Sequence, residues 1–132
     1  MRYLATAAGL MAFAGSVLAN PEIPKYSEKD LVYTRGSPVV KQGNFLVRDI
    51  RQFYDRDKRD TDPFDWDLSV HVRICMRDQE KMKYILGIYD DVAKRLFVLD
   101  INGNVEKVVE GEKEIDAYDR PSLPDCSNLQ KT

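Results

Sequence analysis

Residues 68–76 read Leu-Ser-Val-His-Val-Arg-Ile-Cys-Met, so apolar residues alternate with Ser, His, Arg and Cys. Successive side chains of a strand point to opposite faces of a sheet, and this period of two therefore predicts a half-buried strand. The apolar face of the predicted strand carries Leu68, Val70, Val72, Ile74 and Met76. The opposite, polar face carries Ser69, His71 and Arg73.

The chain after this stretch predicts three more strands. Residues 82–89 are apolar on both faces, as in a central strand, and residues 95–101 are again strand-like. Asn102-Gly103 is a strong hairpin signal because both residues tolerate positive φ, and residues 105–109 would pair back. The result is a meander of four antiparallel strands.

The segment ahead of the meander predicts a helix over residues 44–58. Asn44 is a good N-cap. An apolar stripe follows at helical spacing, formed by Leu46, Ile50, Phe53 and Tyr54. A helix that buries this stripe on one sheet face gives an α+β domain, with one helix packed on a four-stranded antiparallel sheet. If residues 44–58 are instead a pair of strands, a small β-sandwich results.

Shorter elements precede the predicted helix. Residues 20–30 contain two prolines and no periodicity, which indicates an extended leader. Residues 31–33 predict a short strand, residues 36–38 a turn, and residues 39–40 the start of a second strand.

The first nineteen residues have the pattern of a secretory signal peptide. Arg2 supplies a basic start, residues 4–18 are almost wholly apolar or small, and Val17-Leu18-Ala19 gives a small-residue cleavage pattern. The cut is expected before Asn20, leaving residues 20–132 as a single secreted domain. The apolar run is too short for a membrane span, so we expect no association with a membrane.

Charge and cysteine content narrow the class of protein further. The chain has 20 basic and 22 acidic residues and a net charge of −2. Because the charges are nearly balanced and well mixed, the sequence argues against non-specific electrostatic binding to nucleic acid or anionic lipid, which needs a concentrated basic face. The two cysteines, Cys75 and Cys126, predict one disulfide in an oxidising compartment. With one histidine and no CxxC or HExxH motif, we expect no metal site and no cofactor.

The sequence offers no assembled catalytic set. His71 is the only histidine, no nucleophile elbow of the GxSxG type is present, and the carboxylates fall in turns and at element ends. We therefore expect no catalytic residues and no enzyme activity. The candidate binding residues are His71, Arg73 and Lys83, on the polar face of the predicted sheet. Trp66, which leads into the first strand of the meander, is expected to anchor the core, with partner binding as the alternative.

Three stretches resemble a known group of proteins. They are residues 64–70, 83–86 and 96–103. A helix, an aromatic-acidic lead-in and a four-strand meander that ends in a disulfide-held tail resemble the layout of guanyl-specific fungal ribonucleases. The same layout resembles the ribonuclease-like effectors that some plant-pathogenic fungi secrete. Small two-cysteine β-sandwich effectors of fungi share the size and the predicted export of this chain. The resemblance implies a small secreted protein of the effector type.

The chain departs from the active ribonucleases at the positions that matter for cleavage. Those enzymes place a glutamate, an arginine and a histidine on neighbouring central strands, where this chain has Val72 or Arg73, Lys83 and Asp100. Cleavage through a 2′-hydroxyl needs a base and an acid, so the resemblance implies an inactive site.

Together these features predict a secreted, non-enzymatic binding protein of the effector or virulence type. Its expected partner is a host protein, with RNA as a second candidate, and it is expected to act as an extracellular monomer, with entry into a host cell left open. The alternatives are a secreted ribonuclease-like enzyme and a protease inhibitor of cystatin-like form, although the QxVxG motif of the latter is absent.

Overall fold

The computed structural model describes residues 22–56, 66–120 and 122–129. The predicted signal peptide, residues 1–19, lies outside the described residues, as do residues 57–58 at the end of the predicted helix. Within the described part of the chain, no helix is long and apolar enough to cross a membrane.

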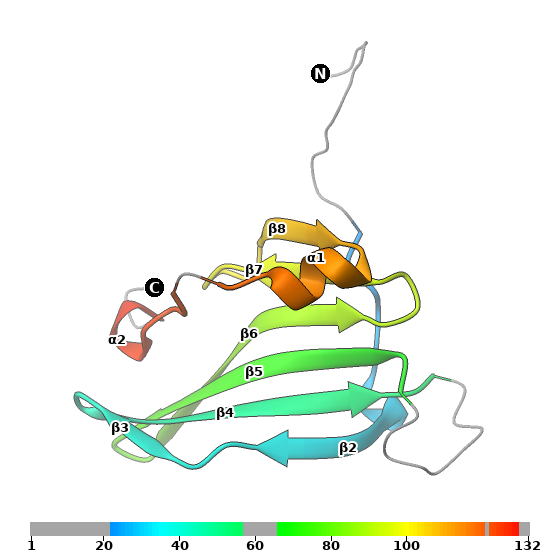
Figure 1. Ribbon diagram of the computed structural model, residues 1–132. Coiled ribbons are helices and arrows are strands. Elements are labelled where there is room, and N and C mark those ends of the chain that lie inside the picture. Colours follow the sequence, from blue (N-terminus) through cyan, green and yellow to red (C-terminus); the bar gives the residue numbers. More distant parts are fainter. Residues whose placement is uncertain (1–21, 57–65, 121, 130–132) are drawn as a thin grey trace, which may run out of the picture.

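The core of the protein is one seven-stranded antiparallel sheet with the order β2-β4-β5-β6-β7-β8, in which β3 also pairs with β4 (Figure 1). The protein is therefore mostly β, with a sheet larger than the four strands expected. The strands are β2 (Leu31–Gly36), β3 (Val40–Gln42), β4 (Phe45–Tyr54), β5 (Leu68–Arg77), β6 (Glu80–Asp90), β7 (Arg95–Leu99) and β8 (Val105–Glu110).

The four-strand meander is confirmed as β5 to β8, each paired with the next. The β5–β6 hairpin turns through Asp78 and Gln79, which both have positive φ. Gly103 has a φ of 82° in the β7–β8 hairpin, as expected for a turn position that glycine tolerates without strain. The short strands expected near residues 31–33 and 39–40 are confirmed as β2 and β3.

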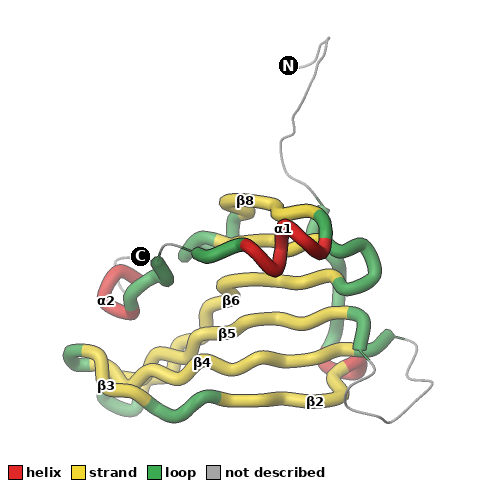
Figure 2. Tube along the Cα trace, viewed as in Figure 1, coloured by secondary structure: helices red, strands yellow, loops and turns green. Residues whose placement is uncertain are grey.

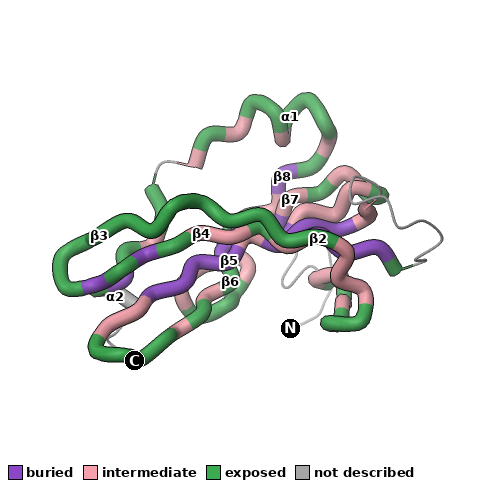
Figure 3. The backbone as a smooth tube through the Cα atoms, turned by 90° about the horizontal axis from the view of Figure 1, so that it is seen from below, coloured by how far each residue is buried: buried purple, intermediate pink, exposed green. Residues whose placement is uncertain are grey.

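The predicted helix over residues 44–58 is wrong, because Phe45–Tyr54 forms strand β4 between β2 and β5. Neighbouring strands satisfy its backbone groups on both sides. Phe45 and Val47 are buried while Leu46 between them is exposed, which is the period of a strand (Figure 3). The helical stripe arose because Phe53 and Tyr54 are both buried, one on each face of a sheet that is covered on both sides. Since β4 is one strand within one sheet, the β-sandwich alternative is not observed either.

The two faces of the sheet are covered by the two ends of the described chain. On the first, which we call the Leu68 face, the segment before β2 crosses the sheet and ends in a 3-10 turn, η2 (Glu28–Asp30) (Figure 1). Ile23 and Tyr26 from this segment pack against a core that includes Tyr54 and Leu68.

The second face, which we call the His71 face, carries the C-terminal segment. This segment contains two short helices, α1 (Glu112–Ala117) and α2 (Cys126–Leu129), and its described residues between them, 118–120 and 122–125, are irregular (Figure 2). The sequence pattern predicted neither helix. The disulfide Cys75–Cys126 is confirmed and ties this segment to β5 near the C-terminal end of that strand.

Candidate functional site

The structure places His71 and Arg73 together on the His71 face, and Lys83 on the opposite face. His71 and Arg73 alternate with the buried residues of β5. Lys83 pairs across β5 with Ile74, a member of the Leu68-face core, while its neighbour Tyr84 pairs with Arg73. The predicted trio is therefore a pair, and Lys83 is separated from it by the sheet.

A row of residues crosses the His71 face at the level of His71. Arg35 in β2 pairs with Arg51 in β4, Arg51 pairs with His71, and His71 pairs with Gly87 in β6. The row continues through Val98 in β7. Neighbouring strands lie about 4.8 Å apart, so the row brings two guanidinium groups and the only histidine together from three strands.

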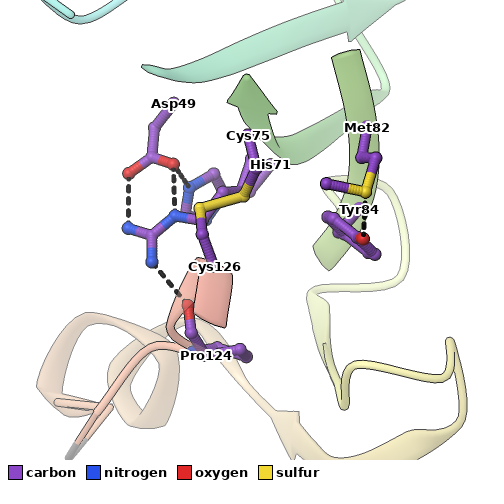
Figure 4. Close-up of a disulfide and its surroundings, with 8 residues drawn as sticks. Asp49, His71, Cys75, Met82, Tyr84, Pro124 and Cys126 are labelled. Atoms are coloured by element: carbon purple, nitrogen blue, oxygen red, sulfur yellow. Dashed lines mark hydrogen bonds and ion pairs between the residues drawn. A yellow bond between two sulfur atoms is a disulfide. The ribbon is translucent and has the colours of Figure 1, made fainter. Parts of the chain in front are cut away.

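Next to this row, Asp49 is held by Arg73 (Figure 4). Arg73 Nε donates to Asp49 Oδ1 at 2.9 Å and Nη2 donates to Oδ2 at 3.0 Å. Its third nitrogen, Nη1, donates to the carbonyl oxygen of Pro124 in the C-terminal segment at 2.6 Å. His71 Nε2 lies 3.8 Å from Asp49 Oδ1. Both oxygens of the carboxylate are thus committed to Arg73.

The charges of the site change the ionisation of its members. Burial alone would raise the pKa of Asp49, but the hydrogen bonds and charge of Arg73, with His71, hold the pKa below its usual range. Burial lowers the pKa of His71; Asp49 opposes this shift, and Arg51, Arg73 and Arg120 add to it. At neutral pH the site therefore holds an ionised Asp49 and a neutral His71.

Arg35 and Arg51 have no acidic partner among the described residues. Partial burial and the neighbouring Arg35 both lower the pKa of Arg51, as expected for two cations placed opposite each other. Like charges that face each other across a strand pair destabilise a sheet. The pair becomes favourable when an anion lies between the two guanidiniums.

Two hollows adjoin the row and share Arg51 and His71 as a common wall. The polar hollow has a volume of about 270 Å³ and is also lined by Arg35, Ser37 and Asp49. The apolar hollow, of about 180 Å³, lies between the sheet and the C-terminal segment. Its other lining residues include Gly87, Leu96, Val98, Tyr118, Arg120 and Leu123.

Two irregularities in the sheet position the wall formed by the C-terminal segment. The pairing of β5 with β6 shifts register beside His71, which makes Leu86 an extra residue, and β7–β8 shifts register after Val98. Bulges leave backbone groups outside the regular ladder. Arg120 donates to the carbonyl oxygens of Leu86 and Leu99, at 3.0 Å each, and so fixes the segment over both bulges.

Sequence analysis did not identify Asp49, Arg51 or Arg120 as site residues. The helix interpretation of residues 44–58 put Asp49 and Arg51 on a solvent-facing surface, far from His71. Reading the same residues as a strand aligns Asp49 with Arg73 and Arg51 with His71. Arg120 lies in a proline-rich stretch without periodicity, and no local signal connects it with the sheet.

Trp66 packs between Phe53 and Tyr89, with ring centroids 5.1 Å and 6.0 Å away, which fits the expected anchoring role. Among the described residues, no group of His, Cys, Asp and Glu side chains could hold a metal ion.

Comparisons of this chain with protein-family models, curated proteins and solved structures found no match. The helix implied by the ribonuclease-like layout is strand β4 in this protein. What the site does must therefore be inferred from its own chemistry, in which two guanidinium groups have no acidic partner among the described residues.

Proposed function

We propose that the protein is a secreted, non-enzymatic binding protein of the effector type, and that it binds an acidic surface of a host protein through its His71 face. The observation that carries this proposal is the row of Arg35, Arg51 and His71 beside a single carboxylate, Asp49, whose two oxygens are both held by Arg73. The guanidinium groups of Arg35 and Arg51 have no acidic partner among the described residues, because the neighbouring carboxylate of Asp49 is bound by Arg73.

Several features of the fold support binding over catalysis. The guanidiniums are held on paired strands, and rigid elements position a site more accurately than loops do. The polar hollow opens at the surface beside an edge strand, where a large partner can reach it. The disulfide Cys75–Cys126 is typical of proteins that mature in an oxidising compartment and supports export.

The proposal is tested by reversing one charge of the row. Arg51→Glu and the control Lys83→Glu, on the opposite face, make the same change in net charge. Each variant and the unchanged protein would be immobilised and exposed to host extracts, with captured proteins quantified by mass spectrometry at low and high salt. We expect Arg51→Glu to lose acidic host proteins that Lys83→Glu retains, and the retained set to fall with salt. Equal capture by the two variants would contradict the proposal.

One observation favours a second candidate, a ribonuclease-like enzyme. His71 Nε2 lies 3.8 Å from Asp49 Oδ1 among guanidiniums that could hold a phosphodiester. A neutral His71 can accept a proton, but in-line cleavage also needs an acid on the other side of the phosphate. Incubation of the purified protein with total RNA tests this candidate. If the protein cleaves RNA and His71→Ala abolishes the cleavage, the function is catalysis and the binding proposal is wrong.

A further inference from the structure

The two hollows on either side of Arg51 and His71 differ sharply in chemistry. The polar hollow offers guanidinium groups from Arg35 and Arg51. The apolar hollow offers hydrocarbon and ring surface from Leu96, Val98 and Tyr118. Since both hollows are open and share Arg51 and His71 as lining, a ligand that reaches across these two side chains can contact both hollows.

The polar hollow fits a tetrahedral oxyanion better than a carboxylate. Each guanidinium presents a planar fork of donors that matches two oxygens, and two forks from neighbouring strands can hold an anion with three free oxygens. Arg35 and Arg51 bring two positive charges without an acidic partner among the described residues. A phosphate ester carries nearly two negative charges at neutral pH and neutralises both, while a sulfate ester carries one and neutralises one.

The apolar hollow is open because of one residue. Gly87 pairs with His71, and a Cβ built on it meets its nearest atoms only at 3.6 Å, from the carbonyl oxygen of Phe97, and at 4.0 Å, from His71 Cβ. A methyl group at this position would therefore make only ordinary van der Waals contacts, and we expect a branched side chain to extend into the hollow. Tyr118 and Leu123 close it from the other side.

We propose that the two hollows together bind an aryl oxyanion ester, an aromatic ring that carries a phosphate or sulfate group, as in a modified tyrosine of the partner protein. This inference rests on the proposed function and names the group that is recognised. The ester group lies between Arg35 and Arg51, and the ring lies over Gly87 against Val98 and Tyr118. Strand spacing puts the Cα of Gly87 about 10 Å from the Cα of Arg51 across His71, and the long side chain of Arg51 can cover part of that span toward the ring.

A single-stranded nucleic acid fits this face less well. Such ligands need a basic groove that follows several successive phosphates. Here the basic row ends at the apolar hollow, and Glu106 lies 3.7 Å from Arg120 beyond it. The site is therefore built for one anionic group and one ring.

The experiment measures binding of small probes by NMR titration of the purified, disulfide-bonded protein. The probes are N-acetyl-tyrosine amide, its O-phosphate and its O-sulfate, with N-acetyl-glutamate amide, inorganic phosphate and inorganic sulfate as controls. We expect at least one ester to bind at least about tenfold more tightly than tyrosine amide, glutamate amide or its own inorganic anion, a difference of about 1.4 kcal/mol. The two ester arms separate phosphate from sulfate.

Variants locate the binding. Arg51→Ala should remove the preference for the ester over tyrosine amide. Gly87→Val should weaken both aryl esters while leaving inorganic phosphate or sulfate unchanged, and Gly87→Ala should have a smaller effect. Lys83→Ala removes a cation from the opposite face and should change nothing. Thermal unfolding of each variant confirms that it is folded.

Three results overturn the inference: equal binding of ester and tyrosine amide, ester binding that survives Arg51→Ala, or an oligouridine that binds more tightly than every ester. If glutamate amide binds as well as the esters and depends on Arg51, this inference fails while the proposed function stands. If no anion binds and capture of host proteins does not depend on Arg51, both fail.

Discussion

Arg73 joins three parts of the molecule through one guanidinium group. It holds both oxygens of Asp49 on β4, it lies on β5, and it donates to Pro124 in the C-terminal segment. Its exposed fraction is 7%, so these bonds form away from bulk water, where breaking one partner of a charged pair is costly. The sequence pattern correctly placed Arg73 beside His71 but could not show that its charge is consumed by Asp49.

His71 makes the stability of the protein sensitive to mild acid. Its folded pKa lies below the ordinary value of 6.5, chiefly through burial. As the pH falls below 6.5, the unfolded chain binds a proton that the folded protein does not yet accept, so the free energy of unfolding declines until the folded pKa is passed. We expect His71→Gln to remove this decline.

Urea unfolding of both proteins at intervals from pH 7.5 to pH 5 measures the effect. The difference in free energy should shift in favour of His71→Gln as the pH falls. Asp49 does not confuse the result, because its lowered pKa places its own loss of stability below pH 3.8. Parallel pH profiles would show that His71 titrates equally in both states.

At the scale of elements, period-two stretches were predictable and β4 was not. Strands β5 to β8 were predictable because β5 alternates with a period of two, the stretch at 82–89 is apolar on both faces as in a central strand, and short turns join the strands. β4 carries Asp49 and Arg51 on the His71 face and Ile50 and Tyr54 on the Leu68 face, so its apolar residues do not alternate cleanly. Only pairing with β2 and β5, which sequence pattern cannot supply, settles its conformation.

Two neighbouring substitutions distinguish the strand from the helix that its pattern suggested. Val47 is 5% exposed and contacts the buried cluster around the disulfide, whereas Leu46 is 47% exposed. Val47→Asp buries an unpaired charge and should lower the free energy of unfolding by about 3 kcal/mol or more. Leu46→Asp should change it by no more than about 0.5 kcal/mol.

Urea unfolding at pH 7 is the measurement, and each substitution is the control for the other. The helical stripe reverses the order, because it buries Leu46 and leaves Val47 outside it. A larger loss for Leu46→Asp would therefore contradict the strand.

In the whole molecule, the sheet is completed by segments from both ends of the described chain. Residues 22–30 cover the Leu68 face and residues 112–129 cover part of the His71 face. The disulfide was predictable from the two cysteines and the predicted signal peptide, but its consequence for the site was not. It holds Tyr118 and Leu123 in place as one wall of the apolar hollow, so covalent closure and ligand binding are coupled.

Removing the disulfide should affect stability and one half of the site. Cys75→Ser/Cys126→Ser opens a loop with a sequence separation of 51 residues, for which loop entropy gives a loss of about 4 kcal/mol. In a domain of this size that loss lowers the melting temperature by at least roughly 10 °C. The unchanged protein with and without reductant, followed by calorimetry, should show the same shift.

Ligand binding by the disulfide-free variant then distinguishes the apolar hollow from the polar hollow. Without the disulfide, the C-terminal segment loses its covalent link to β5 and keeps non-covalent contacts such as the hydrogen bonds of Arg73 and Arg120. We therefore expect chymotryptic cleavage after Tyr118 to accelerate. Aryl esters should bind less tightly because their ring loses the wall formed by Tyr118 and Leu123. Inorganic phosphate or sulfate should bind as before, since Arg35 and Arg51 lie on the sheet itself. If esters and inorganic anions weaken equally, the disulfide supports the sheet as a whole and not this wall in particular.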